Sequence, residues 1–268
     1  MADAGEGSAR PQAGQILRRV LEDAEEEIGR PSSALAFSGL AAGMTMGFSG
    51  LGVAIAQHVL GTGEWQRFVS FGLYPIGFVA VIIGRAQLFT ENTLYPVARV
   101  LDRRSGYLDT LRLWGVVFGA NIVGVLAFAA LMTRLHTLSR GEEAQLVHLG
   151  ENAVSRSFPH VFWSAVIGGW LIALIAWLIE GAAEPVGQIV LIWTLSFVVG
   201  VGGFAHCIAT SGEILGAVLD GGVGVGNYAR WLTAATLGNM AGGVLIVALL
   251  NYGQVMAGRG TRESGRSG

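Results

Sequence analysis

The chain has 268 residues, of which 52% are apolar and 13% are charged, and it contains 41 glycines. That much apolar surface exceeds what one soluble core needs and indicates an all-α polytopic membrane protein. The formal net charge of −2 points to no charged partner, and we expect the lipid bilayer rather than nucleic acid as its surroundings. A single cysteine, Cys207, excludes an intrachain disulfide, and we expect no metal site and no cofactor.

Residues 1–33 are expected to form an acidic head on the cytoplasmic side. Between Gly14 and Arg30 the apolar residues share one side of a helix, and the acidic residues lie elsewhere. The apolar set is Ile16, Leu17, Val20, Leu21 and Ile28. Two interpretations remain open, a solvated helix or a helix that packs against a neighbouring subunit.

Residues 34–254 are expected to form a pore domain with six membrane-spanning segments. Several of its apolar stretches are near the ~20 residues that cross a bilayer. They are roughly 35–59, 68–84 continuing through 92–101, 113–133, 159–179, 186–219 and 231–253. The tail, 255–268, contains many Gly, Arg and Ser residues and is expected to be disordered.

The second and fifth segments are predicted to be broken helices. No charged residue occurs between Pro185 and Gly212, and a continuous helix of that length would be ~42 Å long against a hydrocarbon core of ~30 Å. Glycines at 200, 202 and 203 can break this helix, because a freed backbone is tolerated at that depth where it lines protein or water. In the second segment, Tyr74-Pro75 and Gly84-Arg85 have the same role.

The breaks belong to an internal repeat. Gln87 precedes Asn121 by 34 positions, and His206 precedes Asn239 by 33 positions. Paired interruptions in two hydrophobic halves are typical of transporters whose pathway lies between two inverted repeats, here of three helices each. Asn121 and Asn239 are expected to tether the broken backbone or, alternatively, to contact the solute.

All 17 basic residues are arginines, and their distribution predicts the orientation. With the amino terminus inside, eleven arginines fall in inner segments and five fall in outer loops, the latter being Arg67, Arg134, Arg140, Arg156 and Arg230. We therefore expect both termini to be cytoplasmic.

Three segments, 84–90, 203–210 and 236–243, resemble signature segments of the formate/nitrite transporter family, and the resemblance covers about residues 35–253. It implies an aquaporin-like fold, with broken second and fifth helices, in a homopentamer of the cytoplasmic (inner) membrane. Each protomer would have its own pore for small monovalent anions such as formate, nitrite or hydrosulfide, some of which are carried with protons.

The resemblance also assigns residues to the pore. The family's central histidine falls on His206, and the threonine of its loop falls on Thr90. The positions that it assigns to the constrictions are Tyr74, Phe78, Leu88, Phe89 and Val199.

The chain departs from the family pattern at three positions. Val199 replaces a phenylalanine, and Ala205 replaces the acid that precedes the histidine. The outer lysine aligns near Ala153, where Arg156 is the nearest cation.

Ionisable groups at membrane depth need partners or a cavity. His206 is therefore expected either to lend a proton or positive charge to a passing anion, or to be a buried neutral histidine. Thr90 is expected to hold His206 through its hydroxyl or to act as a helix cap. Arg85, Glu91 and Glu213 lie near the breaks, where capping, an ion pair with Arg85 and contact with the solute are the alternatives.

Transport of small anions or their conjugate acids, passive or proton-coupled, is the function that these residues favour. A channel for neutral solutes and a non-conducting scaffold are the alternatives. We do not expect an enzyme, because the chain has no lysine for a phosphate-binding loop and no nucleophile with a recognisable base.

Overall fold

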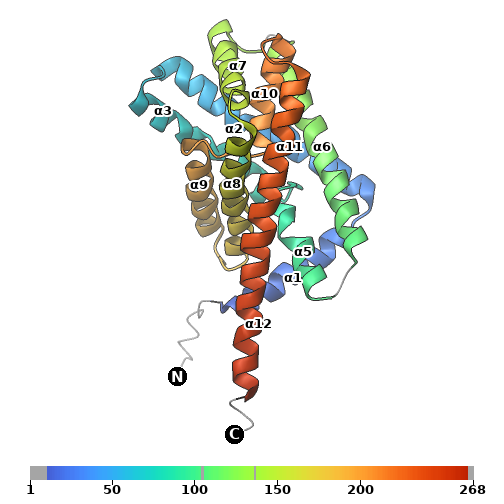
Figure 1. Ribbon diagram of the computed structural model, residues 1–268. Coiled ribbons are helices and arrows are strands. Elements are labelled where there is room, and N and C mark those ends of the chain that lie inside the picture. Colours follow the sequence, from blue (N-terminus) through green and yellow to red (C-terminus); the bar gives the residue numbers. More distant parts are fainter. Residues whose placement is uncertain (1–10, 104–105, 136, 265–268) are drawn as a thin grey trace, which may run out of the picture.

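A computed structural model describes residues 11–103, 106–135 and 137–264, and these residues contain helices but no strand (Figure 1). The first half of the chain comprises α1 (Ala13–Gly29), α2 (Ser32–Leu60), α3 (Glu64–Ser70), η1 (Phe71–Leu73), α4 (Pro75–Ile83), η2 (Glu91–Thr93), α5 (Tyr95–Leu101), α6 (Tyr107–Thr133) and α7 (Arg140–Val154). The second half comprises α8 (Phe158–Ile179), α9 (Pro185–Val201), α10 (Ala209–Asp220), α11 (Val225–Ala241), η3 (Gly242–Ala248) and α12 (Leu249–Ser264).

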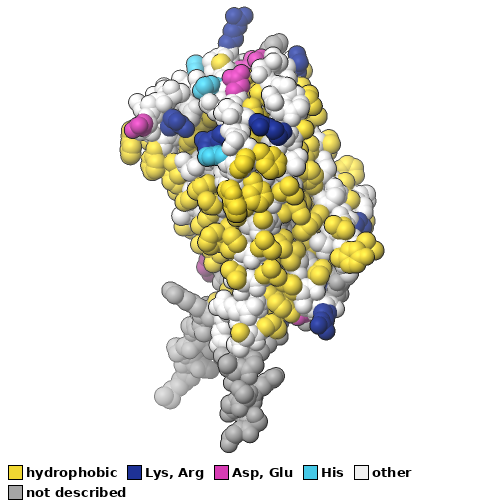
Figure 2. All heavy atoms as spheres, in the orientation of Figure 1, with side chains coloured by type: hydrophobic (Ala, Val, Ile, Leu, Met, Phe, Trp, Pro, Cys, Tyr) yellow, Lys and Arg dark blue, Asp and Glu magenta, His cyan; other side chains and the backbone are white. Residues whose placement is uncertain are grey.

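Five helical stretches in the described residues are long and apolar enough to cross a membrane. The fifth predicted segment is not among them, because it is divided into α9 and α10, as the glycines at its centre predict. Hydrophobic side chains cover the middle of the face seen in Figure 2, and the charged side chains gather toward its ends. This distribution matches a body whose middle is surrounded by lipid.

Prolines mark where helices begin. Pro75, Pro96, Pro159 and Pro185 each occupy one of the first two positions of a helix, where the missing N–H leaves no intrahelical bond unmade. Two of these helices, α4 and α9, are the first halves of the broken elements. The broken elements therefore start at prolines and stop at glycines.

The two first half-helices end in the same way. Gly84 caps α4, and Ala86 N–H donates to the Val81 carbonyl at 3.0 Å. Gly202 caps α9, and Phe204 N–H donates to the Val199 carbonyl at 3.0 Å. This six-residue closure is the Schellman arrangement, and it turns each chain sharply into an irregular loop.

Two helix pairs, α2 with α6 and α8 with α11, pack in corresponding ways. A Cβ added to Gly43 of α2 would collide with the Asn121 carbonyl of α6, and one added to Gly169 of α8 would collide with the Asn239 carbonyl of α11. Glycine at these two positions lets the backbones touch. The close packing brings each asparagine to the loop that it must hold.

The head helix α1 is amphipathic, as predicted, and its apolar face packs against its own protomer. Leu17, Val20, Leu21 and Ala24 are buried against residues of α5, α8, η3 and α12. Neither predicted environment is therefore right for this face, because the same chain covers it. The acidic residues at Asp23 and Glu27 border a cavity described below.

The tail differs from its expectation over most of its length. Residues 249–264 form α12, so the disorder expected from 255 onward is not found up to Ser264, and residues 265–268 lie outside the described part. Before α12, Gly242–Ala248 adopt a π-helix. Gly243 lies there against the Thr93 side chain, where a Cβ would collide with the hydroxyl.

Candidate pore site

Each loop that follows a break is tethered by an asparagine and a serine. Asn121 Oδ1 accepts from Phe89 N–H at 2.9 Å, and its Nδ2 donates to the carbonyls of Gln87 and Gly39 at 2.8 and 2.7 Å. Ser38 Oγ accepts from Gln87 N–H at 3.1 Å. These bonds satisfy backbone groups that would otherwise be unpaired at membrane depth.

The second half repeats this arrangement. Asn239 Oδ1 accepts from Cys207 N–H at 2.8 Å, and its Nδ2 donates to the carbonyls of Ala205 and Ala165 at 2.9 and 2.8 Å. Ser164 Oγ accepts from Ala205 N–H at 3.0 Å. The tethering expected of the asparagines is present in both halves.

These bonds correct the alignment of the halves by one residue. The sequence comparison made Gln87 equivalent to His206. The hydrogen bonds of the two asparagines instead make Gln87 equivalent to Ala205, and therefore Leu88 equivalent to His206. The separation from loop residue to asparagine is then equal in both halves. One half therefore places an apolar side chain where the other places a histidine.

His206 is fully buried at the end of the second break and contacts Thr90 of the first. Its Nδ1 accepts from the Ala209 N–H at 3.0 Å, which puts the proton of a neutral ring on Nε2. Nε2 then donates to Thr90 Oγ1 at 2.8 Å, so the hydroxyl contact expected from the sequence is present. Because Thr90 accepts this bond, its own hydroxyl hydrogen is left to donate, and it makes no side-chain cap.

Apolar side chains close the molecule around this pair. The Phe78 ring meets the His206 ring edge to face with 5.0 Å between centroids, and both Phe78 and Leu88 are fully buried. Tyr74 stacks its ring at a tilt on Phe78, with centroids 5.5 Å apart, and is 3% exposed. Val199 is also buried and borders the same cavity as Tyr74.

Phe89 is not part of this group. Its ring contacts Trp114 and Phe118 of α6, with centroids 6.1 and 4.9 Å away. It borders neither cavity found in the described residues. Phe89 therefore packs on α6, and its place in the constriction stays a prediction.

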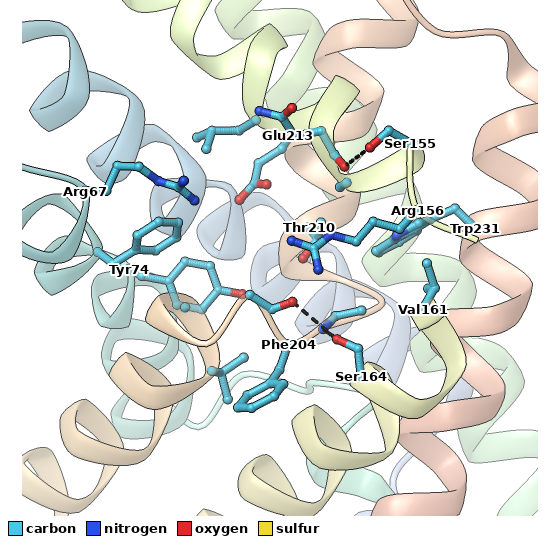
Figure 3. Close-up of a pocket in the computed structure, with 18 residues that line it drawn as sticks. Arg67, Tyr74, Ser155, Arg156, Val161, Ser164, Phe204, Thr210, Glu213 and Trp231 are labelled. Carbon is cyan, nitrogen blue, oxygen red and sulfur yellow. Dashed lines mark hydrogen bonds between the residues drawn. The ribbon is translucent and has the colours of Figure 1, made fainter. Parts of the chain in front are cut away.

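A cavity of about 310 Å³ lies on one side of the central group, beneath α3 and α7 (Figure 3). Arg67 and Arg156 enter it from opposite sides, and the Glu213 side chain points into the space between them. Ala153 and Arg156 both border it, as the aligned position of the family's lysine implies. We call it the outer cavity.

Several residues of the outer cavity were not predicted as site residues. Phe204 and Thr210 flank the predicted His206 in sequence, and their places beside it are the signal that could have found them. Arg67, Ser164 and Trp231 come from three other helices or their ends, and no local motif marks them.

A cavity of about 80 Å³ lies on the other side, next to α1, and we call it the inner cavity. Residues equivalent by the corrected alignment line the two cavities, with Gln87 matching Ala205 and Tyr95 matching Glu213. Equivalent residues thus face opposite sides, as an inverted repeat requires. The acidic residues of the inner cavity are Asp23, Glu27, Glu91 and Glu180.

The predicted pairing of Arg85 with Glu91 or Glu213 is not a direct ion pair. Neither Glu91 nor Glu213 comes within 4.0 Å of the Arg85 guanidinium among the ion pairs of the described residues. Arg85 and Glu91 border the inner cavity, whereas Glu213 borders the outer one. Capping also fails for Glu213, which is the fifth residue of α10, while Glu91 does lie in the first turn of η2.

Glu180 follows α8 and was not predicted as a site residue. Its Oε1 accepts from the Tyr95 hydroxyl at 3.3 Å, and its backbone carbonyl accepts from Arg19 at 2.6 Å. Burial, and next the charge of Asp23, raise the pKa of the Glu180 carboxyl from 4.5 to about 7. The inner cavity thus contains a carboxyl that titrates near neutral pH.

The family model for formate/nitrite transporters matches residues 14–253. The chain is 33% identical to "Inner membrane protein YfdC" of Escherichia coli over 244 residues, which is 90% of this chain and 78% of that protein. It is 25% identical to "Formate channel BtFdhC" of Bacillus thuringiensis, covering 89% of this chain and 93% of that protein. A "Probable formate transporter" of Methanothermobacter thermautotrophicus is 29% identical, over 81% of this chain and 83% of that one.

Solved structures have the same fold. The chain superposes on a structure described as "Pentameric formate channel with formate bound" with a TM-score of 0.72 and 18% identity, covering 84% of this chain and 98% of that one. An "FNT family ion channel" gives a TM-score of 0.77 with 16% identity, covering 88% of this chain and 97% of that one. The matched family model, the full-length relatives and the doubly broken helical fold together show that this membrane protein belongs to the formate/nitrite transporter family.

Proposed function

We propose that this protein conducts small monovalent anions of weak acids, such as formate or nitrite, or their conjugate acids, across the cytoplasmic membrane. The observation that carries the proposal is the centre of the molecule, where His206 and Thr90 lie fully buried between two cavities on opposite sides. A transporter of the family needs such a closed polar point that a solute can reach from either side. The relatives named as a formate channel and a formate transporter support this solute class.

A solute anion at the centre can be bound without breaking the hydrogen bond between His206 and Thr90. The Thr90 hydroxyl hydrogen can donate to an anion while its oxygen still accepts from His206. Phe78 and Leu88 exclude water from that point, which strengthens a hydrogen bond to the anion but makes a bare charge costly. Passage as the neutral acid, or together with a proton, follows from that cost.

In the proposed assembly, five protomers form a ring, each with its own pore, in line with the pentameric channel that shares the fold. The apolar segments α9 and α10 together make the remaining crossing. Both termini lie in the cytoplasm, because eleven arginines fall in the segments that this orientation places inside and five fall in the loops that it places outside. The inner cavity then opens to the cytoplasm and the outer cavity to the other side.

The test is uptake into proteoliposomes of formate and nitrite beside glycerol and methylammonium, from pH 5 to pH 8. We expect entry of the two weak-acid anions and not of the two other solutes. His206→Ala and Thr90→Val should slow that entry, Thr90→Ser should restore it, and His148→Ala, which changes an exposed histidine of α7, should leave it unchanged. Entry of glycerol alone would favour a neutral-solute channel, and no entry above empty vesicles would favour a scaffold.

A further inference from the structure

Glu213 is a buried acid in a cavity that also contains two arginines. It lies in α10, its side chain borders the outer cavity, and the residue is 8% exposed. None of the other described residues that line this cavity is acidic. An ionised carboxylate there would repel the anions that the arginines attract.

No hydrogen bond or ion pair to the Glu213 side chain is found among the described residues. Its stem lies on Gly50 of α2, where an added Cβ would come within 2.6 Å of Cγ and 2.9 Å of Oε1. Gly150 of α7 faces its backbone, and a Cβ at that position would collide with the Glu213 carbonyl. Gly50 therefore makes room for the carboxyl group, which points into the cavity, and Gly150 makes room for the backbone that carries it.

The groups that can influence its charge come from the elements around α10. Arg67, Tyr74 and Arg156 border the same cavity from α3, from the start of α4 and from the turn after α7. On α11, Tyr228 is occupied by a hydrogen bond to Ser211 at 3.1 Å. The positions of α2, α6 and α7 that face α10 include Gly50, Thr133, Leu146 and Gly150, which carry no charge.

Glu213 shares one side of α10 with Thr210, and His206 lies just before that helix. The Thr210 N–H donates to the His206 carbonyl at 3.1 Å, so His206, Thr210 and Glu213 follow one another at helical spacing. Thr210 also borders the outer cavity, so a solute that passes Glu213 meets Thr210 next.

We propose that Glu213 is a specificity-determining residue that admits only anions able to accept a proton. This inference rests on the function proposed above. A weak-acid anion held near Arg67 and Arg156 takes the proton of the Glu213 carboxyl. The O–H bond of Glu213 breaks, an O–H bond forms on the anion, and the neutral acid moves on toward Thr210 and His206.

Glu213 is left as a carboxylate and regains a proton from hydronium in the water of the outer cavity. One proton thus accompanies each anion, and the net step moves no charge. Anions of strong acids, such as nitrate, cannot take the proton. The protonated Glu213 carboxyl therefore does not neutralise them, and the ionised carboxylate repels them.

The experiment compares wild type, Glu213→Gln and Glu151→Gln in proteoliposomes with formate and with nitrate, recording uptake and membrane current. Glu151 is an exposed carboxylate of α7 that does not line the cavity, so its variant is the matched control. We expect wild type and the control to take up formate without current and to exclude nitrate. In Glu213→Gln, nitrate entry should rise about tenfold or more, formate should carry current, and the pH dependence of its uptake should flatten, because the amide neither donates a proton to formate nor becomes the carboxylate that repels nitrate.

Each outcome decides the proposal. Nitrate entry in wild type, or a Glu213→Gln variant that matches wild type or passes neither anion, overturns it. If Glu213→Gln fails to assemble, the same measurements on Glu213→Met, which fills the space without a charge or a proton, decide it. If wild type takes up no formate at all, the proposed function itself fails, and that result is distinct from formate uptake with an unimportant Glu213.

Discussion

Arg85 and Gly203 occupy the same place in the two breaks, and both have a positive φ, 52° and 62°. Each follows the glycine that caps its half-helix. For a residue with a Cβ this left-handed conformation costs roughly 1–2 kcal/mol. One half of the protein meets the conformational demand with glycine, and the other keeps an arginine despite the strain.

Replacing Arg85 by Gly should therefore raise the melting temperature of the purified protein, and replacing Gly203 by Ala should lower it. The gain for Arg85→Gly is expected to be about 1 kcal/mol or less, because glycine also gains entropy in the unfolded chain. Thermal unfolding in detergent measures both. Gly187→Ala, at an α9 position with open space and an ordinary φ, is the control and should not lower stability. A lower melting temperature for Arg85→Gly would show that the Arg85 side chain stabilises more than its backbone strains.

Asn239→Ala should destabilise the protein strongly. The change leaves Cys207 N–H and the carbonyls of Ala205 and Ala165 without their partner, and each buried orphan costs about 1–3 kcal/mol. Asn121→Ala should behave alike, since it removes the same three kinds of bond. Thermal unfolding and the yield of assembled protein are the measurements, with exposed Asn227→Ala as the control. A large loss for only one of the two asparagines would contradict their equivalence.

Leu88→Ala should speed transport and weaken its size selectivity. Leu88 is fully buried at the position equivalent to His206 and borders the inner cavity, so its removal widens the closed centre. Uptake of acetate and propionate relative to formate measures the effect. Leu88→Met keeps the volume and should keep the selectivity. Because Leu→Ala in a core costs about 2–5 kcal/mol, melting temperatures of both variants are needed to separate gating from loss of fold.

Stability should fall as pH rises from about 4.5 to about 7 because of Glu180. Its pKa is raised in the folded state, so the folded protein binds this proton more tightly than the unfolded chain and loses that advantage as the carboxyl ionises. Glu180→Gln removes this contribution while keeping an oxygen for the Tyr95 hydroxyl. Compared with wild type, the variant should gain melting temperature at pH 8 relative to pH 5. An equal difference at both pH values would show that Glu180 is not the titrating group.

Composition and short motifs predicted the helical membrane fold and both breaks. The family resemblance assigned Thr90 and His206 to the pore, and their contact was one of the two alternatives for Thr90. The alignment of the two repeats was wrong by one residue, because it matched side chains of similar chemistry rather than equivalent positions of the backbone. Gln87 and His206 are both polar and were paired, yet the asparagine bonds pair His206 with Leu88. The direction of the Phe89 ring was missed for a related reason, since it depends on the aromatic residues of α6, far along the chain.

Other features had no local signal. Asp23, Glu91 and Glu180 come from three separate elements and meet only because α1 folds back under the bundle. The apolar face of α1 was visible in the sequence, but its partners on α5, α8 and α12 were not. Long-range packing decides such contacts, and periodicity does not encode it.

The π-helix at Gly242–Ala248 sets the rotation of everything that follows it. A π-helical turn accommodates one more residue than an α-helical one, so the residues beyond it are turned by ~100° from where an uninterrupted helix would place them. Beyond the π-helix, Val255 of α12 is buried in one apolar cluster with Leu17 of the head helix. Loss of a single residue from this segment would turn Val255 to another side of α12. The head helix, which contributes Asp23 and Glu27 to the inner cavity, would then lose an apolar contact although no residue of the cavity had changed.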